Sequence, residues 1–257
     1  MLVLASEFSW FNFLPSLPGV EGEGTNLVPF YHACLAALII LVLALLARLA
    51  LQSKIKAAKD EREVLVPDAN LRPRNLLELY TEFIYGLCRN ELGPLAPKFF
   101  PLIAAIFLYI LVNNLMGLVP GFIPATGHIE TNIGMAVIVF FVFNIAGLWV
   151  NGFGYIKHIA GPVLWLAPLI FVIELIGLLA RPATLSLRLY GNMFGDHTVL
   201  SIFMYELPEQ LGMAFLSYGI PVIFLGLGTF VCIVQAFVFS LLAIVYIKLA
   251  TDHEEEH

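Results

Sequence analysis

Charged residues are scarce in this sequence. Asp, Glu, Lys and Arg make up 12% of the 257 residues, whereas soluble domains contain about 25%. No Lys or Arg precedes Arg48, so the N-terminus lacks the basic patch of a cleavable signal peptide and we expect none. A formal net charge of −6 disfavours a nucleic-acid partner. These shortages exclude an ordinary soluble domain.

Cysteines are few and nucleotide-binding motifs are absent. The three cysteines, Cys34, Cys88 and Cys232, form no CxxC or other metal-spaced pair, so we interpret them as small packing residues. The chain has no phosphate loop. We therefore expect no metal site, no cofactor and no catalysis by the chain alone.

The sequence has long apolar runs instead. Hydrophobic residues make up 60% of it, and several runs reach the roughly 20 residues that cross about 30 Å of hydrocarbon. We predict an all-α, polytopic membrane protein with about five membrane-crossing helices plus an interfacial amphipathic helix, the last two crossings being long and strongly tilted. The first three crossings are expected at about 28–51, 99–119 and 133–153.

The expected interfacial helix covers residues 76–93. Its apolar positions at helical spacing are Leu76, Leu79, Tyr80, Phe83, Ile84 and Leu87. They lie opposite Glu78, Glu82 and Arg89, which makes the segment too polar to span a bilayer. Pro94 and Pro97 should end it.

The last two apolar stretches, 163–205 and 211–250, are too long to stand upright. As continuous helices each would reach about 60 Å, roughly twice the hydrocarbon thickness. They must tilt steeply, break, or lie partly along the membrane, and Pro182 is one possible break point. The chain then divides into an outside N-terminal segment (1–27), a first transmembrane helix (28–52), a cytoplasmic loop with the interfacial helix (53–98), and a core of two spans and a long tilted helix pair (99–257).

The distribution of charge predicts the orientation. The basic cluster after the first crossing is expected in the cytoplasm, which leaves the base-free N-terminus outside. The loop 120–130 has no Lys or Arg, and the loop after the third crossing has Lys157 and His158, as the same rule requires. Five crossings place the C-terminus in the cytoplasm. The orienting residues are Glu7, Glu21, Glu23, Lys54, Lys56, Lys59, Arg62, Arg72 and Arg74, and the acidic loop of Glu206 and Glu209 is assigned to the outside.

The stretch 171–200 carries the strongest functional signal. Its ionisable residues are Glu174, Arg181, Arg188, Asp196 and His197, and each costs at least about 2.5 kcal/mol in a bilayer. Because Glu174, Arg181 and Arg188 are seven residues apart, they return to nearly the same side of a helix. Thr184 and Asn192, four residues either side of Arg188, share that side. The result is one polar stripe with an arginine near its middle.

Arg188 suits a fixed barrier. An arginine cannot give up its proton in a protein, so it is a permanent positive charge that a carboxylate must approach in deprotonated form. An ion pair with Glu174 or a snorkelling role is the alternative. Asp196 and His197 can change charge, which suits an entry or exit path for protons. A satisfied buried histidine is the alternative for His197.

Other ionisable residues have simpler interpretations. Arg181 directly precedes Pro182, where freed carbonyls need a donor, so a structural role is favoured. Glu174 is either the partner of Arg181 or a proton site. His32 and Arg48 lie near the ends of the first crossing and are expected to be interfacial.

Three stretches resemble subunit a of the F-type rotary ATP synthases. They are SLRLYGNM (186–193), VQAFVFSLLAIVYIKLA (234–250) and LVNNLMGLVPG (111–121), and the likeness covers nearly the whole chain after the first crossing. The resemblance implies a stator beside a ring of subunit c. Two offset half-channels would carry protons to and from carboxylates on that ring, and the core 99–257 would be the proton channel.

The resemblance also implies site residues, partners and location. The essential arginine falls on Arg188 and its glutamine neighbour on Gln235. The other implied proton-translocation residues are Thr184, Asn192, Glu174, Asn114 and Tyr246. Implied partners are the ring of subunit c, the peripheral-stalk subunit b, the remaining synthase subunits and membrane lipids. The implied location is the bacterial plasma (inner) membrane.

The chain departs from many bacterial members of that family at three places. Asp196-His197 replaces Gly-Glu nine residues past the arginine. Gly228 replaces a histidine of the last helix, and Gly117 replaces an aspartate of the third helix. We hypothesise that Asp196 and His197 form the proton-handling pair of an outward-facing half-channel.

Two other functional classes remain as alternatives. A proton-coupled secondary transporter would favour repeated halves and paired broken helices around a midplane site, and the sequence has no visible repeat. A purely structural scaffold would leave five embedded ionisable groups without a role. The sequence favours protons over sodium ions as the transported species.

Overall fold

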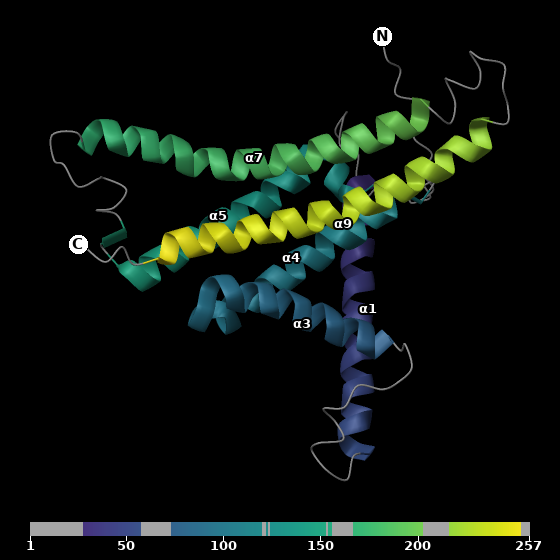
Figure 1. Cartoon of the computed structure of the whole chain (residues 1–257), viewed down its shortest axis with the longest axis horizontal. Coiled ribbons are helices and arrows are strands. Elements are labelled where there is room, and N and C mark those ends of the chain that lie inside the picture. Colours follow the sequence, from purple (N-terminus) through teal and green to yellow (C-terminus); the bar gives the residue numbers. More distant parts are fainter. Residues whose placement is uncertain are drawn as a thin grey trace, which may run out of the picture.

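The computed structural model describes residues 28–57, 73–119, 122, 124–152, 154–155, 167–202 and 216–252 (Figure 1). All regular structure in these residues is helical. Four stretches are long and apolar enough to cross a membrane, namely Asn75–Gly117, Ile129–Asn151, Leu169–Gly195 and Val222–Thr251, and the first helix holds the shorter apolar run Phe30–Leu46. The prediction of an all-α, polytopic membrane protein is confirmed.

The first four helices follow the expected order. They are α1 (Val28–Ala57), α3 (Pro73–Leu92), α4 (Ala96–Gly117) and α5 (Ile129–Asn151). A 3-10 turn, Gly93–Leu95, joins α3 to α4. It begins at Gly93, whose φ is +53°, a conformation that glycine adopts without steric cost. The turn ends α3 just before Pro94, as the sequence predicted.

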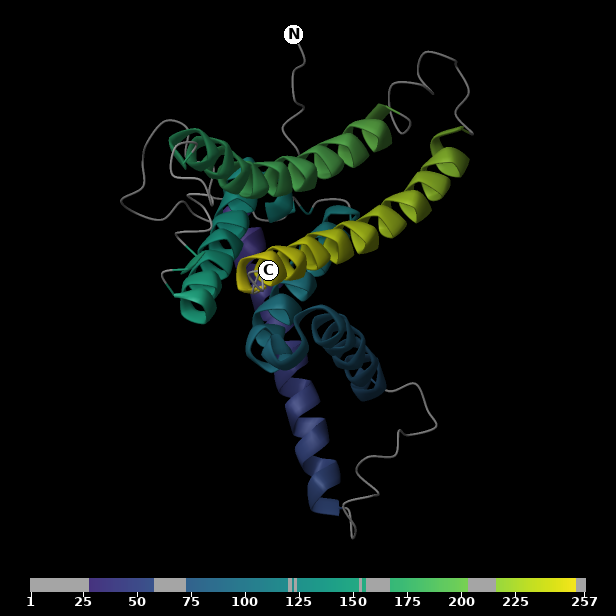
Figure 2. The same ribbon diagram turned by 60° about the vertical axis from the view of Figure 1, so that its left-hand side comes forward.

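The two long helices are α7 (Ala167–Ser201) and α9 (Leu216–Thr251), of 35 and 36 residues. At 1.5 Å per residue each is about 50 Å long. Neither breaks within these bounds, and α7 continues through Pro182. Both lie nearly crosswise to α1 in two views (Figures 1 and 2). Of the options that the sequence left open, a break is therefore excluded within the described bounds, and both helices are steeply inclined to the first helix.

The amphipathic helix α3 packs only part of its apolar surface on the chain. Ile84 and Cys88 are fully buried against α4 and α9. Leu76 and Leu79 keep 60% and 65% of their surface exposed. Lys248, near the end of α9, donates to a carboxylate oxygen of Glu91 at 3.0 Å. The rest of the apolar surface of α3 is left for a membrane interface.

The core lies where α4, α5 and α9 meet. Its largest fully buried side chains include Ile103, Ile110, Phe143, Phe239 and Ile247. A Cβ built on Gly147 of α5 would lie 2.7 Å from the ring of Tyr155 and 2.9 Å from the backbone oxygen of Ala250 in α9. Asn151 strengthens the same crossing by donating to the Ala250 oxygen at 3.0 Å. The crossing of α5 and α9 thus requires a residue without a side chain at position 147.

Most of the charges that oriented the chain fall outside the described residues or on helical residues whose side chains are not described. These are Glu7, Glu21, Glu23, Lys54, Lys56, Lys59, Arg62, Arg72, Arg74, Lys157, His158, Glu206 and Glu209. Of the residues expected to be interfacial, Arg48 is exposed, whereas His32 is fully buried and lies edge-on to Phe122 at 5.8 Å between ring centroids. His32 is thus packed against the chain, and its position at the depth of the membrane interface stays a prediction.

Substitution of Gly147 by alanine should destabilise the protein by about 1–3 kcal/mol, because the added methyl group meets a backbone oxygen that has no room to move. Thermal unfolding of the purified full chain in lipid nanodiscs measures this effect. Gly134→Ala is the matched control on the same helix, since no atom lies within 4 Å of its added Cβ. Equal unfolding temperatures for the two variants would contradict the close crossing.

Candidate functional site

Helix α7 contains six of the predicted site residues, namely Glu174, Thr184, Arg188, Asn192, Asp196 and His197. Because α7 is continuous, the seven-residue spacing of Glu174, Arg181 and Arg188 keeps these residues on one side of it. Thr184 and Asn192 extend the same side. The buried side of α7 consists of Leu178, Leu185, Ser186, Leu189 and Met193. The polar stripe therefore runs along the edge of the surface that α7 buries.

Arg188 lies on the exposed flank of that stripe. Its neighbours Leu185 and Leu189 are 2% and 0% exposed, while Arg188 itself is exposed. Within the described part of the chain, the guanidinium of Arg188 has no hydrogen-bond or ion-pair partner. The alternative ion pair with Glu174 is not formed. Arg188 presents a permanent charge that the described residues leave unneutralised.

Asn192 and Gln235 connect the two motif-bearing helices. The side-chain amide of Asn192 donates to the Oε1 atom of Gln235 at 2.6 Å. Gln235 is only 4% exposed, so α9 holds it inside the helix pair. Asn192 lies one helical turn beyond Arg188, and the bond brings Gln235 against that turn.

Glu174 and Arg181 form a second polar group at the other end of the stripe. Their nearest charged atoms are 3.8 Å apart, and their side chains are 38% and 25% exposed. The guanidinium of Arg181 lies 5.7 Å from the ring centroid of Phe143 in α5 and 5.6 Å from that of Tyr246 in α9, within the range of cation–π attraction. Glu174 is thus the partner of Arg181, and Tyr246 belongs with Arg181 rather than with Arg188.

Tyr155 lies beside this second group. Its hydroxyl donates to the side-chain oxygen of Asn144 at 3.0 Å. Burial raises the pKa of the Tyr155 phenol, and the Arg181 guanidinium opposes this shift. The phenol stays protonated near neutral pH and acts as a hydrogen-bond donor.

A third polar group links α4, α5 and α7, and we call it the asparagine cluster. It consists of Asn114, Thr126, Asn132 and Ser186, each at most 2% exposed. Thr126 donates through its hydroxyl to Asn114 at 2.7 Å, and the Asn132 amide donates to the backbone oxygen of Thr126 at 2.7 Å. The Ser186 hydroxyl lies 3.3 Å from the backbone oxygen of Asn132. Asn114 therefore belongs to a buried network and not to the surroundings of Arg188.

Sequence reasoning found only Asn114 of the asparagine cluster. The sequence criterion, ionisable side chains within apolar stretches, does not select Thr126, Asn132 and Ser186, because their side chains carry no charge. The available signal was an uncharged polar residue at the start of an apolar crossing, as at Asn132, since such residues need partners inside a membrane. Thr184 makes only a local bond, from its hydroxyl to the backbone oxygen of Arg181 at 3.0 Å.

Neighbouring side chains occupy the space beside Gly117 and Gly228, the two glycines that replace ionisable residues of the family. A Cβ on Gly117 would lie 2.7 Å from the ring of Pro124, and a Cβ on Gly228 would lie 2.9 Å from a methyl group of Leu118. Neither position has room for a carboxylate or an imidazole without a shift of its neighbour. Asp196 and His197 belong to α7, but their side chains lie outside the described residues.

Comparison with known proteins places this arrangement in a family. The model of the family described as ATP synthase A chain matches residues 32–248. The chain belongs to this family. ATP synthase subunit a of Bdellovibrio bacteriovorus is 39% identical over 245 residues, which cover 95% of this chain and 99% of that protein. ATP synthase subunit a 2 of Syntrophotalea carbinolica is 46% identical over 184 residues, covering 72% and 74%. Subunit a of Geobacter sulfurreducens is 43% identical over 175 residues, covering 68% and 72%.

Membership of the family settles several broad properties. The chain is a non-catalytic membrane subunit of an F-type ATP synthase complex, and it serves proton transport and ATP synthesis. It is a multi-pass protein of the bacterial inner membrane.

Replacing either partner of the bond between Asn192 and Gln235 by leucine should destabilise the chain by about 1 kcal/mol, since one amide is then left unpaired. Replacing both should cost less than the sum of the two single effects, because no amide remains unsatisfied. Thermal unfolding of the four proteins as a double-mutant cycle measures the coupling. Strictly additive effects would show that the bond contributes nothing.

Proposed function

We propose that the chain is the stator proton channel of its ATP synthase, with Arg188 as the fixed charge that separates two half-channels. The observation that carries this proposal is the exposed guanidinium of Arg188, which has no partner among the described residues, whereas Glu174, Arg181 and Asn192 of the same helix do have partners there. A charge left open in this way suits a carboxylate supplied by another subunit. That carboxylate can approach only in deprotonated form, so protons cannot pass straight along the helix.

Two separate polar groups support offset half-channels. The asparagine cluster lies near the start of α5 and the end of α4 and reaches α7 at Ser186. The group of Glu174, Arg181 and Tyr246 meets α7 nearer its start. The Oδ1 atoms of Asn113 and Asn132 are buried and have no hydrogen-bond partner among the described residues, which makes them suitable sites for water. We assign the asparagine cluster to the outward path and the Glu174 group to the cytoplasmic path.

The partner is proposed to be a ring of subunit c. It would dock on the face of α7 that carries Arg188 and on the adjacent face of α9. Gly191, Gly195 and Gly226 have no atom within 4 Å of a built Cβ, so another helix could approach closely there. Gly228 lacks that freedom because Leu118 occupies the space. Peripheral-stalk subunit b is a further proposed partner. For this chain we keep the orientation that the sequence predicts, with the N-terminus outside and the C-terminus in the cytoplasm, and the predicted division into four parts.

A proton-coupled secondary transporter is the competing function. Reconstitution separates the two: proton flux that requires the c-ring supports the stator, whereas flux that requires a solute supports the transporter. The unbroken course of α7 and α9 argues against the transporter, since paired broken helices are typical of midplane solute sites.

Arg188→Ala should abolish proton-driven ATP synthesis while the complex still assembles, because an exposed side chain without a partner contributes little to packing. Arg188→Lys should also fail, since an ammonium loses its proton more easily when desolvated and lacks the planar fork. ATP synthesis and proton pumping in inverted membrane vesicles measure both effects. Arg48→Ala removes an exposed arginine from α1 and is the matched control. Near-normal synthesis in Arg188→Ala vesicles would refute the fixed-charge role.

Asp196→Asn and His197→Ala should each slow proton uptake from the outer side and shift its pH dependence. An imidazole beside a carboxylate has its charged form favoured and exchanges protons near neutral pH. Flux per assembled complex as a function of external pH measures this role. A helix-end ion pair would instead lower assembly and leave the flux per complex unchanged, and that result would place the outward path elsewhere.

A further inference from the structure

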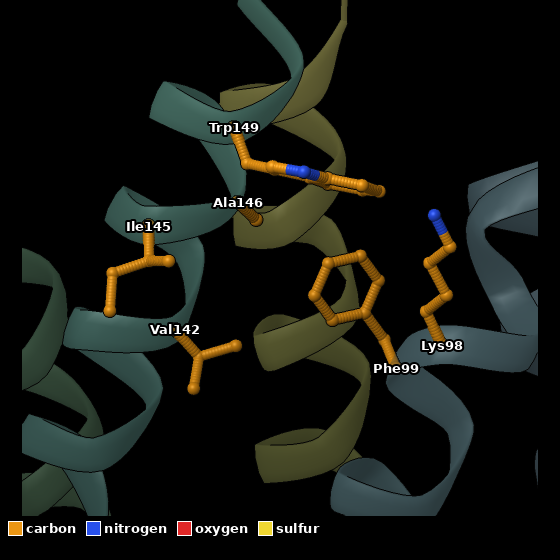
Figure 3. Close-up of a pocket in the computed structure, with 6 residues that line it drawn as sticks. All are labelled: Lys98, Phe99, Val142, Ile145, Ala146 and Trp149. Atoms are coloured by element: carbon orange, nitrogen blue, oxygen red, sulfur yellow. The ribbon is translucent and has the colours of Figure 1, made fainter. Parts of the chain in front are cut away.

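A pocket of about 320 Å³ lies between the first turn of α4 and the C-terminal half of α5 (Figure 3). Its lining consists of Lys98, Phe99, Val142, Ile145, Ala146 and Trp149. Five of these six residues are apolar, and Lys98 carries the one charge. Small-molecule sites begin at about this volume. Helix α9 packs against both α4 and α5 and runs behind the pocket.

Lys98 gives the pocket a positive charge that no carboxylate of the described residues neutralises. Its Nζ atom lies 3.8 Å from the centroid of the Trp149 ring, and Figure 3 shows the two groups side by side at one end of the pocket. Lys98 has no ion-pair partner among the residues that the structure describes. It is also the third residue of α4, so the ammonium lies at the end of the pocket where α4 begins.

The pocket is open toward the surroundings of the protein. Ile145 and Trp149 keep 61% and 60% of their surface exposed, while Ala146 is 3% exposed and lies at the base. This side of α5 also exposes Ile138 and Phe141, as expected of a surface that faces lipid. The occupant must therefore enter from the bilayer and combine an apolar chain with an anionic group. A free inorganic anion would leave the apolar part of the pocket empty.

We propose that this pocket binds one acidic phospholipid of the phosphatidylglycerol class. Its phosphate lies against Lys98 and the first turn of α4, and one acyl chain follows Phe99, Val142 and Ile145. Trp149 closes the headgroup end, where tryptophan is favoured at the membrane interface. Basic pockets between membrane helices are suited to acidic headgroups. The site lies on α4 and α5, apart from the stripe that carries Arg188.

Photolabelling of the intact ATP synthase complex tests the proposal. The probe is a phosphatidylglycerol with a photoreactive group in one acyl chain, and peptide mapping locates the labelled residues of this chain. Labelling should fall on α5 near Val142. Unlabelled phosphatidylglycerol should compete about tenfold better than phosphatidylcholine, because the second lipid has a compensating positive charge. Inorganic phosphate should not compete.

Two variants and one control separate the two halves of the site. Lys98→Gln should weaken labelling about tenfold through loss of the charge, and Val142→Phe should abolish it by filling the groove. Arg89→Gln removes an exposed basic residue from the end of α3, outside the pocket, and should leave labelling unchanged. Equal labelling in Lys98→Gln and Arg89→Gln would overturn the proposal. So would labelling that survives Val142→Phe, equal competition by the two lipids, or displacement by phosphate alone.

Discussion

The cost of an unpaired polar group in hydrocarbon is the constraint on which this structure depends. Helices α4, α5, α7 and α9 carry asparagine, glutamine, serine, threonine and charged side chains through apolar surroundings, and most of them bond to a neighbouring helix or to their own backbone. Arg188, in the polar stripe of α7, differs from them because it is exposed and no described residue pairs with it. A charge in hydrocarbon needs a partner or water, and this need underlies the proposed role of Arg188.

The inclination of α7 determines the direction in which its charged residues are separated. Glu174, Arg181 and Arg188 follow one another at intervals of about 10 Å along the axis. In an upright helix these intervals would separate the groups mainly in depth. Because α7 lies nearly crosswise to α1, the same intervals separate them mainly at right angles to α1. The proposed offset half-channels require a separation of this kind.

The sequence predicts the parts of this arrangement that repeat with the period of a helix. The stripe on α7, the amphipathic character of α3 and the excessive length of the last two stretches all follow from spacing and composition. Contacts between distant segments could not be predicted in this way. The bond of Asn132 to Thr126, the crossing at Gly147 and the pairing of Lys98 with Trp149 depend on how helices pack, and pattern reasoning gives no packing angle. His32 shows the same limit, since position in a run did not reveal the face that α1 buries.

The two glycine departures acquire a physical meaning from this packing. Pro124 lies against Gly117 of α4, and Leu118 lies against Gly228 of α9. Residues at the end of α4 and after it thus occupy the space that an acid at 117 or an imidazole at 228 would need. Buried groups that can change charge need water or partners beside them, and Pro124 and Leu118 leave little room for either at these two places. Asp196 and His197 place an acid and an imidazole side by side in the sequence of α7, a little over one turn past Asn192. For this reason we hypothesise that the titratable step on the outward side lies there.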